Sequence, residues 1–252
     1  MTDLIKTETK DRILVITLNR PDKKNALTHA MYTAIADALA AAREDENTRV
    51  IVFQANGDAF TAGNDLIDFQ KAGGLEGAQP VLRFLNELLI SEKPIIAAVN
   101  GIAVGVGLTM LLHCDLVYMA KGAELQAPFV DLALVPEAAS SLLLPARIGH
   151  VRSAEVFMLG KRVSAEEACA WGLANTVCAP EKLEAVAYKA ALALSKKAPK
   201  SVQTAKRLMR GDKSVIEARM QEESRYFSDQ LKSAEFAEAV TAFLQKRAPD
   251  FQ

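Results

Sequence analysis

One carboxylate stands in a segment of the sequence that is otherwise apolar or small. The segment LALVPEAASSLLLPARIG, residues 132–149, contains Glu137 as its single acid and no base before Arg147. A carboxylate in such surroundings is costly unless a partner or a reaction uses it, because burial disfavours its charged form. The structural alternative is an acid in a first helical turn after Pro136, which stabilises a helix N-terminus by about 0.3–1 kcal/mol.

Two glycine-containing loops follow strand-like apolar runs at matching places. They are FTAGNDL, residues 60–66, and NGIAVGVG, residues 100–107. Ligands of open α/β sheets collect beyond the carboxyl ends of strands, where helix N-termini offer free N–H groups. Two such loops side by side can direct two N–H groups at one oxygen, an oxyanion hole in which each donor contributes roughly 3 kcal/mol to the transition state. Tight structural turns are the alternative, and the spacing excludes the G-x-G-x-x-G pattern of dinucleotide sites.

The other residue types that perform catalysis or bind metals favour structural roles. No histidine shares a metal-ligand spacing with a cysteine or an acid, and no G-x-S-x-G elbow surrounds a serine. Three widely spaced cysteines are too few for a disulfide framework or a zinc knuckle. We therefore expect no metal site, free thiols, and structural positions for the following residues: Cys114, Cys169, Cys178, His29, His113, His150, Ser140 and Ser141.

Alternating strand and helix signals predict a parallel sheet that is covered by helices on both faces. After about residue 136 the strand signals nearly stop; Ser164 and Glu167 form a capping box there, and three or four helices are expected from residue 181 onward. The strands are predicted at residues 13–18, 50–55, 94–99 and 115–120. Earlier helices are predicted from a Thr28 cap to about residue 43, at 80–90 and at 108–113.

The charge balance and the N-terminal residues bound the class of protein. Thirty basic and 31 acidic residues give a formal charge of −1, so no overall basic field indicates nucleic acid or an anionic membrane as a partner. The start MTDLIKTETKDR has no apolar signal core, and no apolar run has the length of a membrane span. We expect a soluble, cytoplasmic protein.

Five motifs occur in the order and spacing of the crotonase, or enoyl-CoA hydratase/isomerase, superfamily. They are FTAGNDL, PIIAAVNGIAVGVGLTMLLHCDLVYMA, LALVPEAASSLLLPARIG, GKRVSAEEACAWGLANTV and AFLQKRAPDF. The resemblance covers about residues 4–251, and it implies an α/β fold with a spiral core of ββα turns and a helical C-terminal trimerisation region. On this basis residues 1–195 are expected to form the core and residues 196–252 the helical region. Apolar residues expected on exposed helix faces support a homotrimer or a dimer of trimers: Leu142, Leu143, Leu144, Phe157 and Met158.

The resemblance also implies which residues form the site. The backbone N–H groups of Ala62 and Val106 would form the oxyanion hole for an acyl-CoA thioester; many relatives have glycine where Val106 stands, but only its N–H is needed. Coenzyme A would be bound as part of the substrate, with no permanently bound cofactor. The residues that resemble coenzyme A contacts are Arg20, Lys24, Ala26, Ala62, Asp65, Leu66, Phe243 and Lys246, the last two reaching a neighbouring subunit's substrate in the family.

Departures from the family pattern indicate the reaction. Typical hydratases carry two glutamates where this sequence has Thr109 and Phe129, and neither residue acts as a general base near neutral pH. We place both residues in the acyl pocket. Glu137 stands where similar peroxisomal-type isomerases, with GNDL and PFxxLxxxPE, place their single catalytic glutamate. Asp131 is the second candidate, because period-2 alternation would place it on the same face as Phe129.

These residues predict a Δ3,Δ2-enoyl-CoA isomerase of fatty acid metabolism, in which one glutamate moves a proton from C2 to C4 of a 3-enoyl thioester. A hydratase, lyase, racemase or hydrolase acting on a CoA thioester is the neighbouring alternative. A catalytically silent CoA-binding assembly module is the alternative from a different class.

Overall fold

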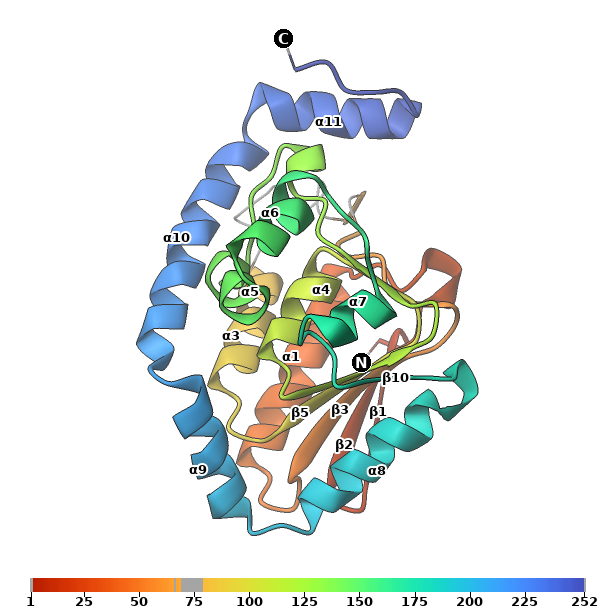
Figure 1. Cartoon of the computed structure of the whole chain (residues 1–252), viewed down its shortest axis with the longest axis vertical. Helices are drawn as coiled ribbons and strands as arrows, with labels where there is room; N and C mark the ends of the chain where they lie inside the picture. The colour runs from red at the N-terminus through yellow and green to blue at the C-terminus, as the bar shows by residue number, and fades with distance from the viewer. Residues whose placement is uncertain (1, 66, 69–78, 252) are drawn as a thin grey trace.

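The computed structural model describes residues 2–65, 67, 68 and 79–251, and within them a six-stranded sheet carries the core (Figure 1). The sheet is parallel from its second strand to its sixth, and only the first strand runs antiparallel to its neighbour. In spatial order the strands are β1 (Ile5–Lys10), β2 (Ile13–Leu18), β3 (Val50–Ala55), β5 (Ile95–Val99), β7 (Leu116–Ala120) and β10 (Thr176–Cys178).

The four central strands of this sheet agree with the sequence prediction, and both edge strands, β1 and the three-residue β10, were missed. β2 and β3 begin and end at the predicted residues, while β5 and β7 each begin one residue later. β1 carries the sequence IKTETK, of which only Ile5 is buried. A strand with one solvent-facing side and almost no apolar residue gives little sequence signal, because periodicity is read from apolar positions.

Helices cover both faces of the sheet, as predicted. Helix α1 (His29–Glu44) is capped by Thr28, whose hydroxyl accepts a hydrogen bond from the Met31 N–H at 3.3 Å. Leu14 lines a cavity together with residues of α1, whereas Val15 lines a cavity with residues of α8 (Leu183–Ser195). Successive side chains of a strand point to opposite faces, so the two helices lie on opposite sides of β2.

A second, four-stranded sheet of short strands was not predicted. It contains β4 (Ala59–Thr61), β6 (Ile102–Val104), β8 (Glu124–Gln126) and β9 (Val163–Ser164) in that order. The first three are parallel, and β9 is antiparallel to β8. Strands of two or three residues are too short for their apolar pattern to be distinguished from that of a loop.

The C-terminal helices extend along one side and across one end of the molecule. The capping box of Ser164 and Glu167 is present, and four α-helices follow residue 181, both as predicted. Figure 1 shows α9 and α10 along one side of the body and α11 across its top. The α-helices not yet named are α3 (Gln79–Ile90), α4 (Val106–Thr109), α5 (Ser140–Ile148), α6 (His150–Met158), α7 (Ala165–Ala170), α9 (Pro199–Arg210), α10 (Lys213–Leu231) and α11 (Ala234–Gln245). Short 3-10 helices are η1 (Pro21–Lys23), η3 (Met110–His113), η4 (Val130–Leu132) and η5 (Pro180–Lys182).

The expected apolar surface on the helices after Ala139 is smaller than predicted. Leu144 and Phe157 are buried inside this chain, and the Phe157 ring lies 6.2 Å from that of Phe129. Met158 is exposed over 66% of its surface. Across the part of the chain that the structure describes, no helix combines the length and apolarity that crossing a membrane requires.

Gly101 marks a close approach between the chain segments that lead into β4 and β6. A Cβ at Gly101 would lie 2.0 Å from the Asp58 carbonyl oxygen, whereas a Cβ at Gly122 meets nothing within 4 Å. We expect Gly101→Ala to lower the free energy of unfolding by at least about 3 kcal/mol, because two backbones must separate. The control Gly122→Ala should lower it by about 1 kcal/mol through its positive φ alone. Denaturant titration measures both values, and equal losses would contradict the close approach.

Candidate active site

The two glycine loops lie side by side at the ends of neighbouring strands. β4 and β6 pair in parallel, so residues 62–65 and 105–107 leave the same edge of the second sheet. Gly63 has φ +89°, and a Cβ there would lie 2.9 Å from the Val104 carbonyl oxygen. Glycine is therefore required at this position both for the backbone conformation and for the contact between the loops. The two loops therefore lie side by side, but they leave β4 and β6 of the second sheet instead of the strands at residues 50–55 and 94–99 after which the sequence placed them.

Backbone hydrogen bonds fasten the first loop to the segment before α1. The Leu27 N–H donates to the Gly63 carbonyl at 2.8 Å, and the Asp65 N–H donates to the Leu27 carbonyl at 2.9 Å. The side chain of Asn25 adds a buried bond to the Ala59 carbonyl, also at 2.8 Å. The positions of residues 62–65 are thus set from two sides, by β6 and by residues 24–27.

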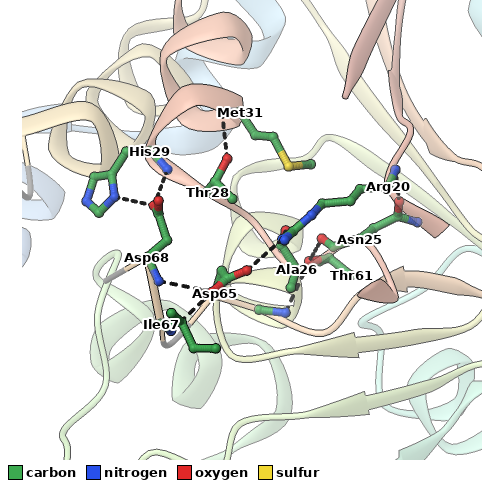
Figure 2. A network of polar contacts seen from close by, with 11 residues as sticks. Arg20, Asn25, Ala26, Thr28, His29, Met31, Thr61, Asp65, Ile67 and Asp68 are labelled. Atoms are coloured by element: carbon green, nitrogen blue, oxygen red, sulfur yellow. Dashed lines mark hydrogen bonds and ion pairs between the residues drawn. The ribbon is translucent and has the colours of Figure 1, made fainter. Parts of the chain in front are cut away.

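Arg20 and Asp65 form the centre of a polar network around this loop (Figure 2). The Arg20 guanidinium donates to the Asp65 carboxylate at 2.7 Å and to the Ala26 carbonyl at 2.9 Å. Burial alone would raise the pKa of Asp65, but the bonds from Arg20 and from the N–H groups of Asp68 and Ile67 lower it below its ordinary value. Asp65 also lines the larger cavity described below, so its carboxylate is an ionised, paired group at the wall.

The hydrogen bonds of the first loop change which N–H group is available as an oxyanion donor. The Ala62 N–H, expected to be one of the pair, donates to the Lys24 carbonyl at 2.9 Å. The N–H groups of Asn64 and Val106 have no acceptor among the described residues. Val106 is the first residue of α4, where N–H groups lack partners within the helix. Its own backbone is helical, and the unusual conformation falls on Gly105 at φ +57°, so valine is accommodated.

Two cavities meet at a shared wall that contains Glu137. The larger, of about 570 Å³, is also lined by the charged side chains of Lys23, Asp65, Asp131 and Arg247. The smaller, of about 70 Å³, is almost entirely apolar and lies between α3 and α10. The residues common to both cavities are Asn64, Val106, Glu137 and Phe227, which we call the neck. The Asn64 and Val106 N–H groups, which have no acceptor in the part of the chain that the structure describes, and the single acid of the segment 132–149 therefore belong to one narrow region.

Glu137 is a half-buried acid whose protonation is shifted toward neutral pH. Its pKa is raised from 4.5 to about 7: burial is the largest cause, the hydrogen bond from the Thr109 hydroxyl opposes it, and the charge of the nearby Glu223 adds to it. A carboxylate with a pKa near 7 is a stronger base than an exposed one and is still ionised in a large fraction of molecules at neutral pH. The first-turn alternative does not describe it, since α5 begins only at Ser140.

The two residues at the hydratase glutamate positions have different surroundings. Phe129 lines the larger cavity and is 6% exposed. Thr109 is fully buried and lines neither cavity as they are described; it lies behind Glu137 and donates a hydrogen bond to that carboxylate. We therefore move Thr109 from the acyl pocket to a supporting role, in which its hydroxyl holds the Glu137 carboxylate.

Other predicted site residues are distributed around the larger cavity. Ala26 and Ala62 line it. Lys24 and Lys246 are exposed and absent from the described lining, whereas their neighbours Lys23 and Arg247 contribute to it. Leu66 and the side chain of Phe243 lie outside the described residues.

Asp131 lines the larger cavity as well, but not for the predicted reason. It lies in the 3-10 helix η4 that follows Phe129, so the period-2 alternation expected for a strand was wrong. Its side chain is exposed and lies close to Gly160, where a Cβ would meet the Asp131 Oδ2 at 2.5 Å. Within the described residues, no three side chains of the His, Cys, Asp and Glu types are grouped as metal ligands would be.

Two groups around the neck were missed by the sequence interpretation. The buried Tyr32 hydroxyl donates a hydrogen bond to the Asn64 side-chain oxygen, which fixes the carboxamide of a neck residue. The His113 Nε2 lies 2.8 Å from the Ala138 carbonyl, directly after Glu137, and burial lowers the pKa of His113 to about 4. Neutral His113 therefore donates this bond. A tyrosine and a histidine on apolar helix faces give no sequence signal for these contacts.

Sequence comparison assigns the chain to a family. A sequence profile described as enoyl-CoA hydratase/isomerase matches residues 8–252. The chain therefore belongs to the enoyl-CoA hydratase/isomerase family and is an enzyme of that family, as the motifs predicted.

Individual relatives include both isomerases and hydratases. Enoyl-CoA delta isomerase 2 of Rattus norvegicus is 36% identical over 242 residues, which cover 93% of this chain and 62% of the rat protein, so the chain spans less than two thirds of that relative. The 2,3-dehydroadipyl-CoA hydratase of Escherichia coli (strain K12) is 31% identical over 256 residues, covering 100% of this chain and 99% of the relative. The crystal structure of an enoyl-CoA hydratase/isomerase from Pseudoalteromonas atlantica T6c has a TM-score of 0.95 at 45% identity, covering 99% of this chain and 100% of that one. These similarities confirm the crotonase-type α/β fold.

The raised pKa of Glu137 predicts a pH-dependent effect on stability. Because its folded pKa of about 7 exceeds the ordinary 4.5, the carboxyl favours folding at low pH, and this contribution is lost as the pH rises through about 7. We expect Glu137→Gln to raise the melting temperature relative to the wild type by a few degrees at pH 8 and by much less at pH 5. Thermal melts from pH 5 to 8.5 measure this, with exposed Glu217→Gln as the control. A difference that does not change with pH would show that Glu137 ionises normally.

Proposed function

We propose that this enzyme is a Δ3,Δ2-enoyl-CoA isomerase that uses Glu137 as its one acid–base group. The observation that carries the proposal is the position of Glu137, with a pKa raised to about 7, in the neck beside two N–H groups that have no acceptor among the described residues. The other carboxylates of the described lining are less suited. Asp65 is paired with Arg20, and Asp131 is exposed.

The proposed reaction moves one proton and requires no water. Ionised Glu137 removes a proton from C2 of the 3-enoyl thioester, and the electron pair passes to the thioester oxygen to form an enolate. The N–H groups of Asn64 and Val106 stabilise this oxygen; Asn64 replaces Ala62 in the pair because the Ala62 N–H already has an acceptor. Glu137 then returns the proton at C4 while the double bond moves to C2–C3. The Thr109 hydroxyl holds the carboxylate in both states.

The two cavities suit the two parts of an acyl-CoA substrate. The apolar cavity between α3 and α10 would take the acyl chain, since it is lined by Val81, Leu82 and Leu85 of one helix and by Met220 and Leu231 of the other. The larger cavity would take the polar part of the thioester. Lys23 on its wall is a cation that attracts phosphate groups, and Arg247 contributes a guanidinium that is already paired with Glu238. Coenzyme A would enter only as part of the substrate.

Hydration is the second candidate, because a full-length relative is named as a hydratase. Adding water across a double bond calls for two groups that hold and divide the water molecule. The hydratase positions here hold buried Thr109 and apolar Phe129, so this site would have to use Asp131 as its second acid. A catalytically silent CoA-binding module is the third candidate. The presence of both an acid with a raised pKa and two N–H donors argues against it.

The role of Glu137 can be tested by removing its basicity while its shape is kept. We expect Glu137→Gln to lower the turnover of a 3-enoyl-CoA by at least about a hundredfold, the low end for loss of a general base. Its thioester affinity should change little, because the N–H donors and cavity walls remain. In the wild type, activity should fall as the pH drops below about 7, where Glu137 becomes protonated. Spectrophotometric rates and equilibrium binding measure these effects.

Asp131→Asn is the matched control for this experiment. It neutralises a second carboxylate of the same cavity, and we expect its turnover to stay within about threefold of the wild type. A large loss in Asp131→Asn together with a small loss in Glu137→Gln would assign the base to Asp131 and reject our proposal.

Substrate choice separates isomerisation from hydration. We expect the wild type to convert 3-enoyl-CoA to 2-enoyl-CoA and to hydrate crotonyl-CoA at least about a hundredfold more slowly, because a second acid–base group is missing. Chromatographic analysis of the products from each substrate gives both rates. Comparable rates of isomerisation and hydration would contradict the one-acid mechanism. Binding of both thioesters without conversion would favour the silent module.

A further inference from the structure

The helix that follows Glu137 begins without a cap from its own sequence. Ala139 precedes α5 and has no side chain that can accept a hydrogen bond. Ala138 and Ala139 both adopt left-handed backbone conformations, with φ +60° and +56°. Such residues cost about 1 kcal/mol or more each outside glycine and persist where neighbouring contacts hold them. The turn that presents Glu137 to the neck must therefore be held from outside.

Glu223 of α10 provides this hold. One carboxylate oxygen accepts the Ala139 N–H at 2.6 Å, and the other accepts the Ser141 N–H at 2.9 Å. Glu223 is 5% exposed, and its partners lie 84 and 82 residues away in the sequence. Burial raises the pKa of Glu223 above its ordinary value, and the bonds from the Ser141 and Ala139 N–H groups oppose this because they favour the ionised form. A remote carboxylate thus performs the capping that a serine or aspartate before α5 would normally perform.

Further contacts hold the same turn from other elements. His113 of η3 donates to the Ala138 carbonyl, and Arg219 of α10 donates to the Ser141 hydroxyl at 3.2 Å. The N-terminus of a helix attracts negative charge, so an acid three residues before Ser140, such as Glu137, would be drawn to it. Glu223 already occupies that place. Glu137 is left to point toward the neck, where its hydrogen-bond partner is Thr109.

We propose that Glu223 is a positioning residue of this site, which occupies the N-terminus of α5 and thereby keeps Glu137 in the neck as an available base. The catalytic part of this inference rests on the isomerase function proposed above. Glu223 itself touches neither cavity as described, so it acts through the turn and through its charge.

The charges around Glu137 predict a pH signature for this role. Negative Glu223 raises the pKa of Glu137, and Arg219 beside Glu223 partly offsets the charge of Glu223. His113, with a pKa lowered to about 4, is neutral in the pH range of interest, and buried Tyr32 on α1, with a pKa raised well above 10, is neutral as well. Removing the charge of Glu223 should therefore make Glu137 easier to ionise, both directly and by freeing N–H groups of α5.

The test compares Glu223→Gln with Glu223→Asp. In Glu223→Gln one oxygen is replaced by an amide group that faces an N–H donor, so both the charge and one bond are lost. We expect kcat for 3-enoyl-CoA to fall at least about tenfold with KM within about threefold, and the acid limb of the rate profile to move down by at least about 0.5 pH unit. Glu223→Asp keeps the charge on a shorter side chain, so kcat should fall while the acid limb stays in place.

Controls and a second measurement separate this inference from the isomerase proposal. Glu217→Gln, the same change at an exposed position of α10, should leave kcat and the acid limb unchanged. A second measurement needs no activity. The melting-temperature difference that Glu137→Gln causes should appear at a lower pH when it is measured in the Glu223→Gln variant than when it is measured in the wild type.

An unchanged kcat and acid limb in Glu223→Gln, with the same pH dependence of the melting difference, would overturn the role of Glu223. If the protein shows no isomerase activity, the melting comparison still decides whether Glu223 shifts the ionisation of Glu137. If Glu223→Gln does not fold, Glu223→Asp decides: wild-type kcat, or a displaced acid limb, would overturn the inference.

Discussion

The Glu137 carboxylate lies in a partly buried environment that disfavours its negative charge, and contacts from the surrounding structure compensate for this cost. Burial is the main reason that its pKa is raised to about 7, so near neutral pH both the protonated and the ionised form are populated. A hydroxyl from α4 contacts one of its oxygens, and α5 begins after it through two left-handed residues. If this turn relaxed into an ordinary helix start, the acid would become a structural N-terminal residue. The basicity of Glu137 and the strained backbone of the two residues after it therefore depend on the same turn.

The second requirement of the site is the parallel register of β4 and β6. These three-residue strands place the two glycine loops at one edge, and the bonds to residues 24–27 fix the first loop from its other side. The electrophilic part of the proposed site consists of backbone N–H groups. Side-chain changes such as valine at position 106 are accommodated there, whereas an added Cβ at Gly63 or Gly101 meets backbone atoms.

The sequence predicted the parts of the fold whose signal lies in neighbouring residues. The apolar strands, the Thr28 cap and the capping box of Ser164 were correct because each depends on neighbouring residues. The second sheet was missed because its strands are too short to show a period. Ala62 was assigned as a donor from its place in a motif, and the motif contains no information that the Lys24 carbonyl accepts its N–H. Contacts that join α10 to the start of α5 depend on the tertiary fold and cannot be read from spacing.

The neck divides the lining residues into those that can meet the reacting atoms and those that cannot. Side chains of α3 and α10 beyond the neck line only the apolar cavity, at a distance from Lys23 and Arg247, which line only the larger one. Substitutions such as a bulkier residue at Leu82 or a smaller one at Met220 would alter the room available to the apolar end of a ligand without altering the donors or the acid. In such an architecture selectivity and reactivity are separate variables, and a lineage of enzymes can diversify the first while it retains the second.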